Sequence, residues 1–329
     1  MKAIGSICIQ ICAVALSAGG AMSGESYVWP APPDVARFAF VKSIDCKGLS
    51  PKAGALGRAV RWLGGATETD RISLPFDLVV RGTDLFLVCQ NVPALVQVDM
   101  TRGTFRRLVD DHKTIRYPIS LGSSDDGTIY FTDSESRRVY RYRKGKIDPF
   151  IVDGLGRPTG IAVLSVQRRL FVVDTEDHCL RMFDFDGRLL GRVPREGDSV
   201  SFHYPTFAAP TPSGQVLVND ALNYQIKRFD ADGNFLGAFG SEGDGPGSFA
   251  RPKGIGVDGE GHIYVVDNLF DNFQVFDDSG RVLLTIGSAG QEPGQFWSPA
   301  GIEITGDYIY IADTFNDRVQ VFRYLGAGK

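Results

Sequence analysis

Residues 249–276 read FARPKGIGVDGEGHIYVVDNLFDNFQVF, and residues 296–322 read FWSPAGIEITGDYIYIADTFNDRVQVF. Each segment places an aromatic residue three positions before a proline and then continues with a short apolar run. A second apolar run ends on aspartate, and a third ends in Gln-Val-Phe. The two segments are therefore copies of one structural unit, and such internal repeats decide the fold.

The anchor proline of this unit recurs along most of the chain, at intervals of 40 to 47 residues. Each unit holds short runs of β-forming residues separated by Gly or Asp-Gly turns; in the fifth unit there are four, at 254–258, 262–267, 272–277 and 281–286. Four antiparallel strands in a unit of this length predict a propeller blade. We therefore expect an all-β, six-bladed β-propeller with blades starting near Pro75, Pro118, Pro158, Pro205, Pro252 and Pro299.

The sixth unit holds only three strand-like runs, at 301–305, 308–312 and 318–323. A strand-like run at 36–44 precedes the first unit, and we expect it to close the sixth blade as a latch, which would cover an open sheet edge. Between latch and first blade, Leu56, Val60 and Leu63 have helical spacing, and Gly64 follows. Residues 52–64 are therefore predicted to form one short helix, either as a cap on the propeller or as a docking element.

The N-terminus predicts export. Lys2, the apolar run Ile4–Leu16 and the small residues Ser17–Ala21 follow the order of a secretory signal. We expect a signal peptide at 1–21, an extended segment at 22–35 and a propeller at 36–329, in the periplasm or outside the cell. The apolar run is shorter than the roughly 20 residues that span a bilayer, so no transmembrane segment is expected in the mature chain. A membrane anchor, or a lipid anchor on Cys12, is the alternative.

Composition narrows the classes of function. The chain of 329 residues has a net charge of −4, which gives no bulk attraction to nucleic acid. No Cys-x-x-Cys pair is present, so neither a zinc ribbon nor a thioredoxin-like site is expected. Cys46, Cys89 and Cys179 remain after cleavage; one disulfide is an open alternative to small buried side chains.

The repeat resembles the NHL repeat, whose pattern is aromatic-x-x-Pro-x-Gly-Ile, then Tyr-Val-x-Asp, then Asn-x-Arg-Val-Gln-Val-Phe. The sixth unit matches it almost residue by residue, and the first departs most, with Cys89 where the others have aspartate. The stretch from Trp29 to Asp34 looks like that of exported bacterial NHL proteins. The resemblance covers about residues 30–325 and implies the propeller fold; the family includes both binding proteins and enzymes.

In a propeller of this strand order, the loops leading into the blades and those between second and third strands share one face, where ligands usually bind. The leading loops are rich in Arg, Tyr and Trp, the residue types that dominate interface hot spots. We expect this face to bind a protein or peptide, with a carboxylate-bearing or acidic partner suiting its basic residues. The candidate binding residues are Arg116, Tyr117, Arg157, His203, Tyr204, Arg251, Lys253 and Trp297. The alternative is that these side chains only bridge adjacent blades.

Aspartate ends the second strand of five units, at Asp133, Asp174, Asp220, Asp267 and Asp313. Five carboxylates around a ring would suit a cation. Because they recur with the repeat, we instead expect them to cap backbone amides in the neighbouring turns.

Catalysis is the alternative to binding. Some NHL-related lyases use zinc and carry a histidine beside the repeat proline, but none follows the prolines here. His112, His178 and His203 could still ligate a metal near the axial channel, giving a metal-dependent lyase or hydrolase. No serine elbow or carboxylate pair stands out. The expectation from the sequence is therefore an exported binding or scaffolding protein without a cofactor.

Overall fold

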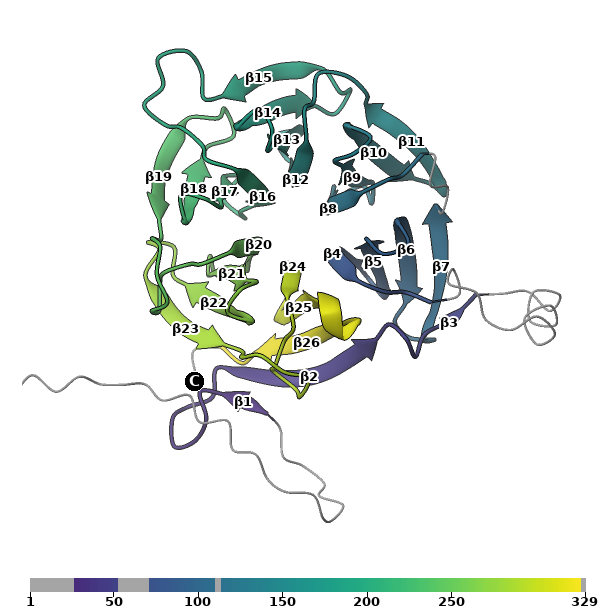
Figure 1. Cartoon of the computed structure of the whole chain (residues 1–329), viewed down its shortest axis with the longest axis vertical. Coiled ribbons are helices and arrows are strands. Elements are labelled where there is room, and N and C mark those ends of the chain that lie inside the picture. Colours follow the sequence, from purple (N-terminus) through teal and green to yellow (C-terminus); the bar gives the residue numbers. More distant parts are fainter. Residues whose placement is uncertain (1–26, 53–70, 110–113, 327–329) are drawn as a thin grey trace, which may run out of the picture.

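The computed structural model describes residues 27–52, 71–109 and 114–326. Its strands form six sheets around a central axis, and each blade has its first strand nearest that axis (Figure 1). The predicted all-β, six-bladed propeller with four-stranded antiparallel blades is confirmed. The helix predicted at 52–64 lies almost entirely outside the described residues.

The first strand of every blade begins at an anchor proline. Blade 1 comprises β4 (Pro75–Arg81), β5 (Asp84–Cys89), β6 (Ala94–Asp99) and β7 (Thr104–Val109). Blade 2 comprises β8 (Pro118–Ser123), β9 (Ile129–Asp133), β10 (Arg138–Arg143) and β11 (Lys146–Ile151). Blade 3 comprises β12 (Pro158–Leu164), β13 (Arg169–Asp174), β14 (Cys179–Asp184) and β15 (Leu189–Val193). Blade 4 comprises β16 (Pro205–Pro210), β17 (Val216–Asp220), β18 (Gln225–Phe229) and β19 (Phe235–Phe239). Blade 5 comprises β20 (Pro252–Val257), β21 (Ile263–Asp267), β22 (Asn272–Phe276) and β23 (Val282–Ile286).

Blade 6 joins strands from both ends of the described chain. It consists of β24 (Pro299–Thr305), β25 (Tyr308–Asp313), β26 (Arg318–Tyr324) and β2 (Phe38–Asp45). β2 runs antiparallel to β26, with register pairs from Phe38–Tyr324 to Asp45–Arg318 (Figure 1). β1 (Val28–Trp29) pairs with β2, and β3 (Ser50–Pro51) pairs with β7. A 3-10 turn, η2 (Thr314–Asn316), lies between β25 and β26.

The core lies between the blades rather than within one centre. Six clusters of buried apolar side chains each join two adjacent blades. Between blades 5 and 6, Phe322 packs edge-on against Phe273, Phe40 and Trp29 at centroid distances of 5.5, 5.8 and 5.6 Å. This arrangement follows from the alternation of the strands, since each blade buries both of its faces against neighbours.

The inner strands approach one another so closely that glycine is needed at three repeat positions. A Cβ on Gly160 or Gly254 would lie 2.6 Å from backbone atoms of the next blade's inner strand. A Cβ on Gly301 would lie 2.2 Å from the Asp77 carboxylate. All three glycines stand two residues after an anchor proline, which accounts for the Pro-x-Gly signature of the repeat.

The repeated aspartates cap the leading loops, as the sequence predicted. The Asp133 carboxylate accepts hydrogen bonds from the amides of Arg116 and Tyr117 at 2.7 and 3.1 Å. Asp174 does the same for the amides of Gly156 and Arg157, both at 2.8 Å. Equivalent bonds join Asp220 to His203, Asp267 to Ala250 and Arg251, and Asp313 to Trp297. The structural interpretation of these carboxylates is confirmed.

A second set of caps crosses from one blade to the next. The side chains of His178, Asp271 and Asp317 accept hydrogen bonds from the leading-loop amides of the following blade. The donors are the amides of Tyr204, Ser298 and Leu74, at 3.0, 2.7 and 2.7 Å. Blade 1 has Cys89 in place of the repeat aspartate, so Asp317 of blade 6 supplies the carboxylate that caps its leading loop.

Replacing Asp317 with alanine should lower the free energy of unfolding by about 1 to 3 kcal/mol, because the Leu74 amide loses a charged acceptor. The variant also loses the 2.9 Å ion pair with Lys47, whose exposed side chain makes that contribution small. Urea denaturation measures the change. Asp317→Asn, which keeps an acceptor oxygen, should lose less. If Asp317→Ala cost no more than Asp307→Ala at an exposed turn, the cap would be unimportant for closing the ring.

All three cysteines in the described residues are buried and free. Cys46 and Cys89 lie in the cluster between blades 6 and 1, and Cys179 begins β14. They therefore serve as small buried side chains, one of the two alternatives left by the sequence.

Candidate functional site

The leading loops and the loops between second and third strands form one face of the ring, which we call the proline face. The two sets of carboxylate and imidazole caps described above hold these loops together. Within blades they join the end of the second strand to the leading loop, and between blades they join successive loops. The backbone of this face is therefore fixed before any ligand binds, which lowers the entropic cost of binding.

At the centre of the proline face, two aromatic side chains meet across the axis. Phe76 follows the anchor proline of blade 1, and Phe207 lies in the inner strand of blade 4, on the opposite side of the ring (Figure 1). Their ring centroids are 6.0 Å apart. The Lys253 Nζ of blade 5 lies 5.7 Å from the Phe76 ring centroid, a cation–π contact. These three side chains narrow the mouth of the axial channel.

Three cations gather near this mouth. Burial, and next the positive charges of Arg251 and Arg157, lower the pKa of Lys253 to about 8. The Arg157 guanidinium donates to the Tyr204 hydroxyl at 2.6 Å and lies 5.9 Å from the centroid of that ring. This part of the proline face is thus positively charged on an acidic chain.

Apolar side chains cover the part of the proline face formed by blades 4 to 6. Leu222, Leu269 and Phe315 each stand two residues after the repeat aspartate, and Trp297 lies in the leading loop of blade 6. All four are between 46% and 55% exposed. Trp297 and Phe315 contact each other edge-on, with centroids 5.7 Å apart. In blades 1 to 3 the equivalent position, two residues after Cys89 or the repeat aspartate, is polar. It holds Asn91, Glu135 and Glu176.

Below the mouth, the inner strands enclose an axial cavity of about 210 Å³. Its lining combines apolar side chains with a larger polar surface, and two carboxyls line it from adjacent blades, Asp77 from β4 and Glu303 from β24. Burial raises the pKa of Asp77 to about 7, although the Leu121 amide donates to this carboxyl at 2.8 Å. Burial, and next the Asp77 charge, raise the pKa of Glu303 to about 8. The cavity is therefore poorly suited to carry two negative charges at neutral pH.

The structure brings together four of the predicted binding residues and separates the others. Arg157, Tyr204, Arg251 and Lys253 lie around the channel mouth. The Tyr117 hydroxyl instead donates to Gln90, and Trp297 pairs with Phe315. Arg116 is exposed on blade 2. His203 lies beside His178, with ring centroids 6.1 Å apart.

Asp77, Glu303 and the apolar positions Leu222, Leu269 and Phe315 are not among the site residues predicted from the sequence. A signal for them exists in the repeat. Two residues after the anchor proline, blade 1 has Asp77 where three other blades have glycine. Four residues after the anchor proline, blade 6 has Glu303 where the other five blades have Gly, Ala or Val. Aligning the six units position by position would have exposed these departures.

The histidines alone form a weak metal site. The Nδ1 atom of His178 accepts the hydrogen bond from the Tyr204 amide at 3.0 Å, which leaves only Nε2 for a metal. His112 lies outside the described residues, and the structure gives no third protein ligand beside His178 and His203 within the described ranges. Two imidazoles are fewer than the three protein ligands of a catalytic zinc site.

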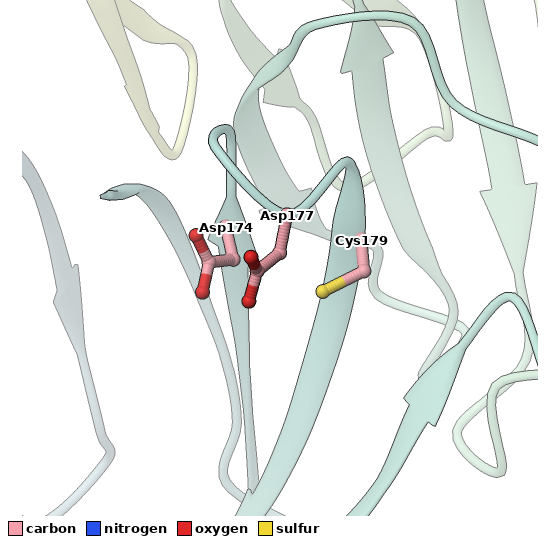
Figure 2. Close-up of side chains that lie close together, drawn as sticks. All are labelled: Asp174, Asp177 and Cys179. Carbon is pink, nitrogen blue, oxygen red and sulfur yellow. The ribbon is translucent and has the colours of Figure 1, made fainter. Parts of the chain in front are cut away.

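Asp174, Asp177 and Cys179 also lie close together, with potential ligand atoms within 4.8 Å of one another (Figure 2). The Asp174 carboxylate already accepts from two loop amides and from the Arg181 Nε at 3.1 Å. Arg181 also pairs with Asp177. Burial raises the pKa of the Cys179 thiol to about 11. This cluster is therefore the loop cap of blade 3, in which one guanidinium already pairs with both carboxylates.

Comparison with known proteins supports the architecture. A family model described as a 6-bladed beta-propeller matches residues 259–326. None of the curated proteins matches the sequence. Within the described residues, no helix is long and apolar enough to cross a membrane.

Three solved structures illustrate the likeness. A protein of unknown function from Bacteroides thetaiotaomicron is 17% identical, with a TM-score of 0.66 over 79% of this chain and 71% of its own. An auxiliary nutrient binding protein from the same organism is 14% identical, with a TM-score of 0.61 over 77% and 69%. Virginiamycin B lyase from Staphylococcus aureus, solved with quinupristin, is 17% identical, with a TM-score of 0.59 over 79% and 97%. At these identities the similarity shows the fold alone.

Proposed function

We propose that this protein is a binding or scaffolding propeller that engages a protein or peptide through its proline face. One observation carries the proposal: exposed Leu222, Leu269, Trp297 and Phe315 share that face with the cations at the channel mouth. Exposed apolar side chains grouped on one face mark interaction surfaces, and Trp and Arg are the residue types that dominate them.

The similarity to nutrient-binding propellers supports a binding role. The NHL-type repeat pattern and the signal-like residues 1–21 support an exported member of the NHL-repeat proteins, acting in the periplasm or outside the cell. A partner would therefore belong to the cell envelope or to the extracellular medium. Nucleic acid fits neither the proposed location nor the net charge.

Removing the aromatic pair tests the use of this face. Trp297→Ala with Phe315→Ala should weaken partner binding by at least about 10-fold, since truncating hot-spot side chains costs above 1 kcal/mol each. The measurement is quantitative crosslinking of purified wild-type and variant protein to the envelope fraction of the source organism, followed by binding assays with the purified partner.

Leu189→Ala with Leu236→Ala is the matched control, because these exposed side chains lie on the outer strands β15 and β19. It should leave binding unchanged. If the control weakened binding and the aromatic variant did not, the partner would use the perimeter of the ring, and the proposed face would be wrong.

Metal content distinguishes the proposed binding function from the alternative of a metal-dependent lyase or hydrolase. We expect protein purified without chelator or added metal to contain no stoichiometric transition metal. About one equivalent of zinc, lost in His203→Ala, would instead favour the enzyme.

A further inference from the structure

Two sets of three cations on the proline face differ in their partners. Arg181, Lys227 and Arg318 each pair with the repeat aspartate of their own blade, at 3.1, 2.5 and 2.7 Å. These are structural ions that complete the loop caps. Arg157, Arg251 and Lys253 make no ion pair with any carboxylate in the described part of the chain. The repeat therefore does not account for the second group.

Two of the three unpaired cations, Lys253 and Arg157, are held in place without an anion. Lys253 lies against Phe76, which lies against Phe207, so its side chain is fixed between the inner strands. The hydroxyl of Tyr204 and its ring orient the Arg157 guanidinium. Because like charges repel, gathering them beside one another opposes folding, and an anion placed between them would relieve the repulsion.

We propose that Lys253, Arg157 and Arg251 form a subsite for the C-terminal carboxylate of a peptide ligand. The inference rests on the proposed binding function and assigns the chemistry of its centre. A carboxylate satisfies a Lys ammonium and guanidinium groups through short, charge-assisted hydrogen bonds. The Phe76 and Phe207 rings meet across the axis beside Lys253 and block the way into the channel, so the carboxylate stops at the mouth.

The surroundings favour a peptide end over a free inorganic anion. The Phe76 and Phe207 rings are in contact across the axis, with centroids 6.0 Å apart, so a ligand that reaches Lys253 must lie on the face above them, where the exposed apolar side chains are. Asn219 donates to the carbonyl of Lys253 at 3.2 Å, which ties the second strand of blade 4 to this site, and Leu222 follows in the next loop. A peptide whose carboxylate lies at Lys253 can therefore lay apolar side chains on Leu222, Leu269 and Trp297.

Fluorescence anisotropy with paired peptides tests the subsite on the full chain. The probes are fluorescein-labelled hexapeptides ending in Leu, Phe or Ala, each made with a free C-terminal carboxylate and with a C-terminal amide. At pH 6.5 and low salt, at least one free acid should bind about 10-fold or more tightly than its amide. Lys253→Met, which keeps the apolar stem, and Arg251→Gln should each reduce the binding of the acid toward that of the amide. Arg281→Gln, at an exposed turn on the outer half of blade 5, is the control.

Acetate supplies a readout that needs no peptide. In protein whose lysines carry ¹³C-methyl groups, saturating acetate should raise the titration midpoint of Lys253, because a bound anion stabilises the ammonium form. The midpoint should not change on addition of acetamide. An unchanged midpoint with acetate would overturn the subsite.

The outcomes distinguish this inference from the proposed function. Equal binding of acid and amide, abolished by Trp297→Ala with Phe315→Ala, would overturn the carboxylate subsite and leave the binding face standing. Displacement of the acids by inorganic phosphate at equal or lower concentration than acetate would also overturn it in favour of a phosphate site. If none of the probes bound, the subsite as stated would be wrong, while crosslinking to the envelope fraction would still test the face.

Discussion

Replacing Phe322 with alanine is expected to lower the free energy of unfolding by about 3 to 5 kcal/mol, the range for removing a buried phenyl ring. Phe322 is fully buried and contacts aromatic rings from three parts of the chain: Trp29 in β1, Phe40 in β2 and Phe273 in blade 5. The cavity would lie where β1 and β2 meet β26, so it would weaken ring closure as well as local packing. Denaturation by guanidinium chloride measures the loss.

Phe315→Ala is the matched control, because the same chemical change occurs at a half-exposed ring with one aromatic contact. We expect it to cost less than about 1 kcal/mol. A loss below that value for Phe322→Ala would mean that the β2–β26 joint tolerates the cavity by collapse, and that the closing strand contributes little to stability.

Neutralising the channel carboxyls should stabilise the protein at mildly alkaline pH. The folded pKa values of Asp77 and Glu303, about 7 and about 8, lie above their usual values, so the folded state holds more protons than the unfolded state between about pH 4 and pH 8. Wild-type stability should therefore fall as pH rises through this window. A shift of about three pKa units corresponds to roughly 4 kcal/mol, and we expect Asp77→Asn or Glu303→Gln to recover about 2 to 4 kcal/mol at pH 8.5.

Urea denaturation of each variant at pH 5 and pH 8.5 checks this expectation. The difference between variant and wild type should be small at pH 5 and large at pH 8.5. Asp307→Asn, at an exposed turn of blade 6, should show no such pH dependence. Equal effects at both pH values would show that the carboxyls are already ionised in the folded protein, and the assignment of a neutral channel would fail.

The fold was predictable because the repeat encodes it at short range. The spacing of the anchor prolines, the Pro-x-Gly pattern and the aspartate after the second strand each have a local cause that a sequence displays. Glycine at 254 and 301 reflects contact between neighbouring inner strands, and Asp267 caps a loop 16 to 17 residues before it. Because these two contacts recur in several blades, the pattern of one repeat unit could be used to predict the strands and loops of the others.

The candidate site was only partly predictable, because its contacts cross the ring. Phe76 and Phe207 are separated by three blades in sequence and meet only when six blades close around the axis. Arg157, Arg251 and Lys253 were predicted to share one face, but the effect of the two arginine charges on the pKa of Lys253 depends on that closed geometry. The sequence shows that Glu303 departs from the repeat, but it does not show which side chains of other blades lie beside Glu303.

The pairing of β2 with β26 also sets the order in which the molecule can be completed. Phe38 leaves the ribosome 286 residues before its register partner Tyr324. Until then the early strand has no edge to join, and forming this contact requires closing a very long loop, which slows folding of such topologies. Until β2 pairs with β26, the open edge of blade 6 can pair with another chain, so a chaperone that keeps the chains apart would have its greatest effect in that interval.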